Sequence, residues 1–144
     1  MSKKSLILVI IQFSSFLFFG LVGNLFATKH LLALQIAGLI IGIWGIVVMK
    51  LGHFNIQPEV KNQAQLVLTG PYKIIRNPMY LGLLMFFGLS LFSKFDYLRL
   101  FVFLILTTVL ILKIVMEETF LTKRFGEVYL NYKKKTYRLI PFVF

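Results

Sequence analysis

The chain has 144 residues, of which 58% are hydrophobic, and it carries a formal net charge of +11 with no cysteine. Its mean hydropathy of +0.84 excludes an ordinary soluble domain, in which about 45–50% of residues are apolar, and its length fits one domain. The lack of cysteine excludes disulfides and thiolate metal sites, and with only His30 and His53 a histidine-rich metal site is excluded as well.

Four apolar segments follow one another along the chain, at residues 6–26, 31–49, 79–92 and 98–116. A membrane-spanning helix needs about 20 residues, so the first, second and fourth segments are long enough and the third is short. The first segment is longer than the apolar core of a signal peptide, which has about 7–15 residues, and this favours an uncleaved helix. The sequence therefore predicts an all-α integral membrane protein with four transmembrane helices.

Short connections join these helices into two hairpins, because residues 28–30 and 94–97 separate the members of each pair. We expect a single membrane domain over residues 1–144. It would consist of a first helical hairpin at 1–51, a cytosolic loop at 52–78, a second hairpin at 79–116 and a cytosolic C-terminal segment at 117–144.

Lysine and arginine lie at the ends of the apolar segments rather than within them. Most are found at the N-terminus, in residues 50–76 and in the tail from residue 123. The positive-inside rule then predicts that both termini are cytoplasmic, with the cell (inner) membrane as the expected location. This placement indicates contact with anionic head groups of the bilayer, and it argues against nucleic acid as a partner.

Glycines in the second segment predict close packing of two helices. Gly38 and Gly42 have the spacing that lets helix backbones approach each other, and Gly45 follows one turn later. We expect the packing partner to be the first segment, which carries Gly20 and Gly23, because the short connection makes these two helices neighbours. A contact between two copies of the chain is the alternative.

Residues 66–82 read LVLTGPYKIIRNPMYLG and form a polar, turn-rich insert between apolar segments. The dipeptides GP and NP mark two turns, and Pro78 suits the first turn of a helix, where no N–H is needed. Such a helix start offers unpaired N–H groups and a positive dipole end. Gly82 allows close approach of a ligand or of another backbone, while Tyr72 and Tyr80 offer aromatic faces with hydroxyl groups. A loop anchored at the membrane interface by these tyrosines is the alternative.

The end of the fourth segment carries Lys113, Glu117 and Glu118. Two carboxylates oppose the dipole at a helix C-terminus, so we expect the helix to continue to Phe125 and to stop at Gly126. Lys113 shares a face with Glu117, whereas Glu118 points about 100° away and needs other partners. An ionisable residue at that depth indicates a functional site, and a lysine that reaches the membrane surface beside an ion pair is the alternative.

Several of these motifs together resemble the membrane methyltransferases related to isoprenylcysteine carboxyl methyltransferase and the phospholipid N-methyltransferases. The resemblance runs from about Phe54 to Pro141, and the first hairpin matches only in being apolar. It is carried by these residues, in this order: Leu66-Val67, Gly70-Pro71-Tyr72, Arg76 to Tyr80, Gly82, Glu117-Glu118, Phe125-Gly126-Glu127, Tyr129, Tyr132 and Arg138 to Pro141.

The resemblance implies a compact helical membrane protein that binds S-adenosylmethionine near the cytosolic face and methylates a lipophilic acceptor. It implies that the cofactor contacts Gln57, Ala64, Gln65, Leu66, Val67, Tyr72, Asn77, Pro78, Met79, Tyr80, Gly82, Glu117 and Glu118. Lys113 would face the acceptor, and Lys113 and Glu117 are the expected catalytic residues. No metal is expected, since the methyl donor is already activated.

The chain departs from the family at Asn77, where the family usually has histidine. Asparagine donates and accepts hydrogen bonds but does not titrate. Neither histidine is clearly placed as a base, which favours acceptors that need no deprotonation, and Lys113 fits an anionic head group. A non-catalytic lipid-binding or assembly protein on the same fold is the alternative. A small four-helix transporter is a further one, although the carboxylates lie near segment ends or in loops rather than deep in the membrane.

Overall fold

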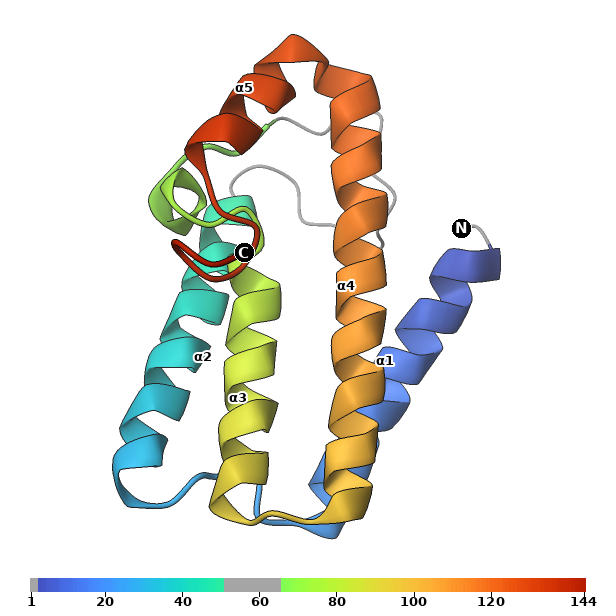
Figure 1. The fold of residues 1–144 in the computed structure, drawn as a ribbon, viewed down its shortest axis with the longest axis vertical. Coiled ribbons are helices and arrows are strands. Elements are labelled where there is room, and N and C mark those ends of the chain that lie inside the picture. Colours follow the sequence, from blue (N-terminus) through green and yellow to red (C-terminus); the bar gives the residue numbers. More distant parts are fainter. Residues whose placement is uncertain (1–2, 51–65) are drawn as a thin grey trace.

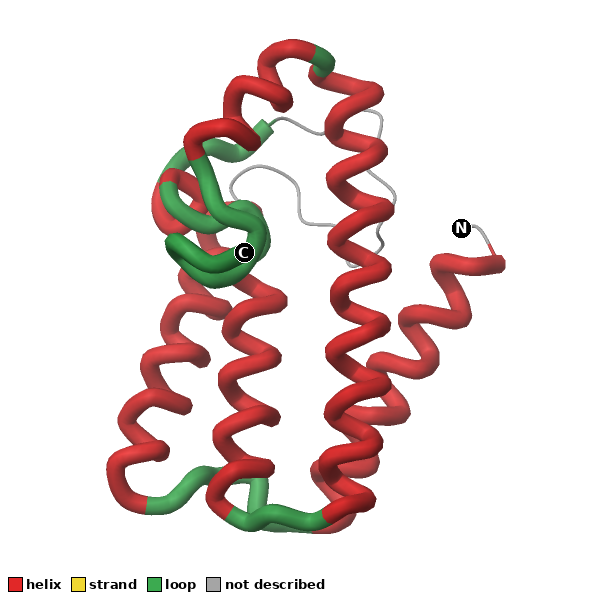
Figure 2. The backbone as a smooth tube through the Cα atoms, in the orientation of Figure 1, coloured by secondary structure: helices red, strands yellow, loops and turns green. Residues whose placement is uncertain are grey.

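The computed structural model describes residues 3–50 and 66–144 of the chain, and over these ranges it is helical with no strand (Figures 1 and 2). The elements in chain order are α1 (Lys3–Val22), α2 (Lys29–Lys50), the short 3₁₀ helix η1 (Gly70–Lys73), α3 (Pro78–Ser93), α4 (Tyr97–Phe125) and α5 (Glu127–Lys135). The long helices stand side by side, and η1, α5 and the C-terminus gather at one end of the bundle (Figure 1).

Three helices are long and apolar enough to cross a membrane, namely α1, α2 and α4, and α3 is a shorter apolar helix of 16 residues. The all-α integral membrane fold is therefore confirmed. At 1.5 Å per residue, α4 extends about 43 Å and α3 about 24 Å, against a hydrocarbon core of about 30 Å. The upper part of α4 thus extends past the start of α3, and α5 contacts it there, while η1 lies against α2 (Figure 1).

Glycines bring α2 and α3 into close contact. A Cβ atom added at Gly82 of α3 would lie 2.8 Å from the carbonyl oxygen of Gly38 and 2.9 Å from Cα of Gly42, both on α2. One at Gly45 would lie 2.9 Å from Cγ of Pro78. The sequence left open whether Gly82 allows close approach of a ligand or of another backbone. The structure shows the backbone of α2 in contact with it.

The expectation that α2 packs through these glycines on α1 is wrong. Nothing lies within 4 Å of a Cβ built at Gly20 or Gly23, and Gly23 sits past the end of α1 with a φ of +76°. A glycine-to-glycine contact needs small residues on both helices. Gly82 is the small residue that α3 contributes, whereas Gly23 lies in the turn after α1. Sequence proximity along a short connection did not determine the packing partner.

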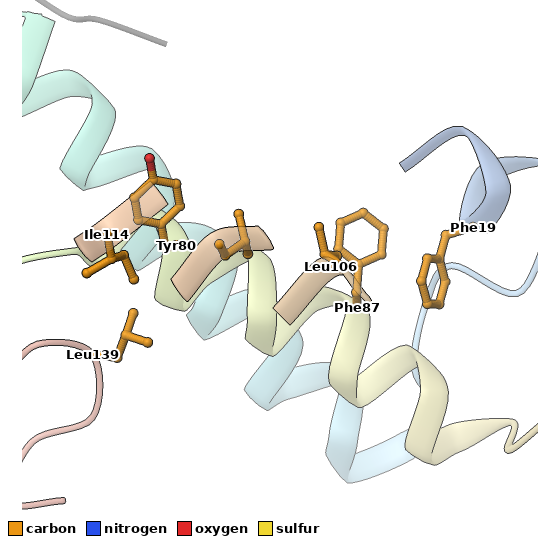
Figure 3. Close-up of a cluster of buried hydrophobic side chains, with 7 residues drawn as sticks. Phe19, Tyr80, Phe87, Leu106, Ile114 and Leu139 are labelled. Carbon is orange, nitrogen blue, oxygen red and sulfur yellow. The ribbon is translucent and has the colours of Figure 1, made fainter. Parts of the chain in front are cut away.

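Helix α1 instead packs against α4 and α3 through aromatic side chains. Phe19 is fully buried, and its ring centroid lies 4.9 Å from that of Phe87 on α3. Phe16 stacks on the same ring at 5.1 Å. Figure 3 shows Phe19, Phe87 and Leu106 of α4 at one end of the buried cluster and Tyr80 at the other. The core therefore runs along the bundle from the α1 contact to the start of α3.

Buried polar side chains link the helices at the end of the bundle farthest from α5. Gln35 accepts a hydrogen bond from the Ala27 N–H and donates to the carbonyl oxygen of Phe86, each within 2.8 Å. Arg99 donates to Ser90 Oγ at 2.6 Å and to the carbonyl oxygen of Asn24 at 3.3 Å. These hydrogen bonds attach the connection between α1 and α2 to α3 and α4. They hold the helices in place at the end of the bundle farthest from α5.

We expect Gly82→Ala to destabilise the protein, because the new methyl group would collide with the backbone of α2. The expected loss is about 1–3 kcal/mol, the range for overpacking a tight contact. Thermal unfolding of the detergent-purified protein measures it. Gly20→Ala is the matched control, since its methyl group meets no atom within 4 Å, and an equal loss in both variants would contradict the packing described here.

Candidate functional site

The turn-rich insert folds against the end of α2. Gly70 begins η1 with a φ of +59°, a conformation that suits glycine. Tyr72, two residues later, is buried and donates from its hydroxyl to the carbonyl oxygen of Gly45 at 3.3 Å. The backbone oxygen of Tyr72 accepts a hydrogen bond from the Tyr132 hydroxyl at 2.7 Å. The insert is therefore held between α2 and α5.

Both tyrosine hydroxyls are donors that keep their protons. Burial raises the pKa of Tyr72 above its ordinary value, and the negative charge of Glu117 raises it further. Burial is also the main cause that raises the pKa of Tyr132. These groups therefore stay protonated at neutral pH and hold the insert as neutral hydrogen-bond donors.

The start of α3 follows as predicted, with Pro78 in its first turn. Asn77, just before it, makes no side-chain cap. Its amide nitrogen instead donates to the carbonyl oxygen of Arg138 at 3.0 Å, and the residue is 8% exposed. Asn77 therefore ties the helix start to the C-terminal segment. The same segment pairs with the insert through a backbone bridge between Ile75 and Tyr137.

A buried carboxylate on α4, Glu118, organises this end of the molecule. Arg76 donates from Nε to Oε1 at 2.9 Å, and Arg138 donates from Nη2 to Oε2 at 2.9 Å. Lys133 of α5 lies 3.4 Å from Oε2. Arg76 also donates to the carbonyl oxygens of Lys133 and Thr136. Glu118 thus links α4 to the insert, to α5 and to the tail.

Glu117, the neighbouring carboxylate, has a different partner, as expected from the helical period. The Tyr80 hydroxyl donates to its Oε1 at 2.5 Å, and the described part of the chain places no donor on Oε2. Tyr80 is buried and Glu117 is partly exposed. Figure 3 shows the Tyr80 hydroxyl pointing away from Leu139 of the tail. A carboxylate with one oxygen fixed and one available suits a cationic ligand.

Lys113 lies one helical turn before Glu117 and is 2% exposed. Its Nζ donates to Oε1 of Gln12 on α1 at 2.6 Å and lies 5.5 Å from the centroid of the Tyr80 ring. Tyr80 therefore contacts both expected catalytic residues, Lys113 through its ring and Glu117 through its hydroxyl. Residues 80 and 117, which are far apart in the sequence, meet directly.

The structure describes some of the other predicted site residues but does not bring them to the contact between Tyr80 and Glu117. Leu66 and Val67 are partly buried just before η1, and Pro78, Met79 and Gly82 line the α2 side of α3. Gln57, Ala64, Gln65 and His53 lie outside the described residues. Cofactor contacts of all these residues stay predictions.

Two further residues have partners in the structure that the sequence alone does not indicate. Gln12 was visible as a polar residue in an apolar segment, but nothing in the sequence paired it with Lys113. Arg138 belonged to the resembling motif, yet its ion pair with Glu118 had no sequence signal beyond opposite charge.

The arrangement suits a small zwitterionic ligand. Glu117 offers an oxygen to an ammonium or sulfonium group, and the first turn of α3 offers backbone N–H groups to a carboxylate. S-Adenosylmethionine carries both kinds of group, so the chemistry of the donor set fits it. Among residues 3–50 and 66–144, no group of three His, Cys, Asp or Glu side chains could hold a metal ion.

The chain matches one family model among known protein families. The family model for phospholipid methyltransferase matches residues 21–128, three quarters of the chain. The matched range contains α2, η1, α3 and α4, and only the end of α1. A search of the curated proteins finds no match.

We expect Glu118→Gln to loosen the C-terminal segment, because it removes the charge that balances Arg76 and Arg138. Breaking one partner of a buried ion pair costs about 3–5 kcal/mol. Lower thermal stability and faster tryptic cleavage within residues 133–138 are the expected results. Glu127→Gln, an exposed carboxylate at the start of α5, should change neither, and unchanged cleavage in Glu118→Gln would contradict the proposed linkage.

Proposed function

The chain belongs to the phospholipid methyltransferase family, and we propose that it transfers a methyl group from S-adenosylmethionine to a lipophilic acceptor at the cytosolic face of the membrane. Family membership supports methyl transfer to lipids as its general activity. The observation that carries the finer proposal is the hydrogen bond between Tyr80 and Oε1 of Glu117. It joins the end of the turn-rich insert to α4, and no residue among 3–50 and 66–144 donates to Oε2.

In this proposal the cofactor lies along the insert and the start of α3. Glu117 would hold its cationic groups, and the N–H groups of the first turn of α3, at Met79 and Tyr80, would hold its carboxylate. Tyr72 and Asn77 would border it, with Leu66 and Val67 as apolar neighbours. When bound, the cofactor supplies an activated methyl group. The protein then contributes proximity and alignment, the main needs of an in-line displacement.

Lys113 would receive the head group of the acceptor, and the bilayer would hold its apolar tail. A carboxylate acceptor needs no general base, which agrees with a site whose described residues include no titratable histidine. An anionic head group also suits a buried ammonium. Lys113 would thus bind the acceptor, and Glu117 would bind the cofactor.

Both termini would lie in the cytoplasm, with the chain in the cell (inner) membrane. The Glu118 network, α5 and the tail would then face the cytosol together with the insert. A C-terminal fusion to alkaline phosphatase, which is active only outside the cytoplasm, should be inactive, and an active fusion would reject this orientation.

A non-catalytic lipid-binding protein on the same fold is the second candidate. Asn77 favours it, since the side chain does not titrate and its amide nitrogen is engaged by the carbonyl oxygen of Arg138. Binding of the cofactor without transfer to any lipid would support this candidate over the enzyme.

We expect Glu117→Gln and Tyr80→Phe to weaken S-adenosylmethionine binding. The first removes the negative charge and the second removes only the hydroxyl that orients it, so the first should have the larger effect. Losses of about tenfold or more correspond to at least about 1.4 kcal/mol of binding free energy. Equilibrium dialysis with labelled cofactor measures them. Glu127→Gln is the charge-matched control, and parental affinity in both site variants would reject the site.

We expect labelled methyl groups to enter the lipid fraction when the protein is incubated with methyl-labelled S-adenosylmethionine and a total lipid extract. Mild base should release the label, because methyl esters hydrolyse and methylated amines do not. Base-stable label would show transfer to nitrogen instead. No labelled lipid despite cofactor binding would reject the enzymatic proposal.

A further inference from the structure

Residues 139–144, which read LIPFVF, form a turn that exposes apolar side chains. Phe142 is 86% exposed and Val143 is 78% exposed. Leu139 attaches the turn to the protein, since it is buried in the same cluster as Tyr80. Exposed apolar side chains that lie next to one another mark a surface that meets an apolar partner.

The backbone of this turn is hydrogen-bonded to itself. The N–H groups of Leu139 and Ile140 donate to the oxygen of Phe144 at 2.7 and 2.9 Å. The N–H groups of Val143 and Phe144 donate to the carbonyl oxygen of Ile140 at 3.2 and 3.0 Å. Backbone polar groups need such internal partners where water is scarce, as it is next to the acyl chains of a membrane. The turn therefore suits an apolar surrounding in its backbone as well as in its side chains.

Phe142 has a backbone conformation that favours glycine. Its φ is +66°, in the left-handed region that is rare for a bulky residue. Its ring lies 5.1 Å from that of Tyr137, centroid to centroid, yet most of the side chain stays exposed. Phenylalanine at this position costs stability within the chain, and an apolar partner outside the chain would offset that cost.

The turn lies at the depth where α3 begins. Asn77, the residue before α3, donates to the carbonyl oxygen of Arg138, the residue before the turn. Figure 3 shows Leu139 at the end of the buried cluster that carries Tyr80. Because α3, with its 16 residues, extends about 24 Å against a hydrocarbon core of about 30 Å, its start cannot extend beyond that core. The turn beside it therefore lies near the boundary between acyl chains and head groups.

Exposed lysines precede the turn. Lys134 and Lys135 end α5, and no carboxylate among residues 3–50 and 66–144 forms an ion pair with either of them, whereas Lys133 lies 3.4 Å from Glu118. Anionic head groups attract lysines, and the boundary of the acyl chains accepts apolar side chains. A basic pair next to an apolar turn thus favours a lipid surface as the partner.

We propose that residues 139–144 insert into the membrane leaflet beside the start of α3, with Phe142 and Val143 at the acyl chains and the two lysines on anionic head groups. The turn is then a membrane anchor for the C-terminal segment. Arg138, which precedes it, binds Glu118, so the anchor is attached directly to the ion-pair network at that end of the bundle. This inference needs only the integral membrane fold and does not depend on methyl transfer.

A spin label at residue 143 measures the depth of the turn. The chain has no cysteine, so Val143→Cys creates a single labelling site. The labelled protein is placed in vesicles of phosphatidylcholine with phosphatidylglycerol, and its collisions with oxygen, which concentrates among acyl chains, are compared with those of a water-soluble nickel chelate. Labels at Leu104→Cys, an exposed apolar position of α4, and at Lys123→Cys, an exposed position near its end, give the two reference depths.

We expect the label at residue 143 to favour oxygen over the chelate, as the label at residue 104 does. A preference for the chelate equal to that at residue 123 would place the turn in water and overturn the proposal. Phe142→Gly suits the observed φ and removes the ring, so chelate collisions at residue 143 should rise severalfold, whereas Phe142→Leu keeps an apolar side chain and should leave them unchanged. Parental collisions in Phe142→Gly would also overturn the proposal.

Two further comparisons separate the anchor from its alternatives. Replacing Lys134 and Lys135 together by glutamine should raise chelate collisions at residue 143 in the mixed vesicles but not in phosphatidylcholine alone, and no effect in either would overturn the role of anionic head groups. A contact between two copies of the chain would shield the label as well. It would broaden the spectrum by spin–spin coupling that disappears on dilution with unlabelled protein, and that result would overturn the membrane anchor.

Discussion

One buried carboxylate holds together the end of the bundle at which the chemistry is proposed to occur. Glu118 on α4 bonds to Arg76 of the insert and to Arg138 of the tail, each at 2.9 Å. Helix α3 is too short to fill the space beside the upper part of α4, so the insert and the tail occupy it. The two partly buried arginine side chains carry positive charge that needs a negative partner. Glu118 provides that partner from α4.

Two adjacent glutamates therefore have different partners: Glu118 binds the arginines of the insert and the tail, whereas Glu117, which accepts a hydrogen bond from Tyr80, is proposed to bind the cofactor. Because successive residues on a helix differ by about 100° in direction, Glu118 faces the arginines while Glu117 faces Tyr80 at the start of α3. Fixing Glu118 also fixes the backbone that carries Glu117. The partly exposed carboxylate is thus pre-positioned by its buried neighbour, which would favour binding of the proposed cofactor. Lys113, one turn earlier, extends the same face of α4 toward α1.

The sequence was most informative where a local rule decides the structure. Pro78 placed the start of α3, Gly126 placed the end of α4, and the helical period separated Glu117 from Glu118. Contacts between distant segments were harder to predict. The glycines of α2 could not indicate whether α1 or α3 would face them, because both helices offered a glycine. The pairing of Gln12 with Lys113 had no signal, since one amide in an apolar helix has many equivalent partners. The hydrogen bond of Asn77 to the carbonyl oxygen of Arg138 in the tail had no sequence signal either, because an amide can pair with any backbone carbonyl group.

In the proposed site, Tyr80 and Glu117 form one side and the start of α3 completes it. An experimental structure with S-adenosylhomocysteine, the product that methyl transfer would leave, tests it most directly. We expect the amino group of the ligand to lie within hydrogen-bond distance of Glu117 and its carboxylate to lie at the N–H groups of Met79 and Tyr80. A ligand bound elsewhere on the chain, with the Tyr80–Glu117 contact left solvent-filled, would contradict it.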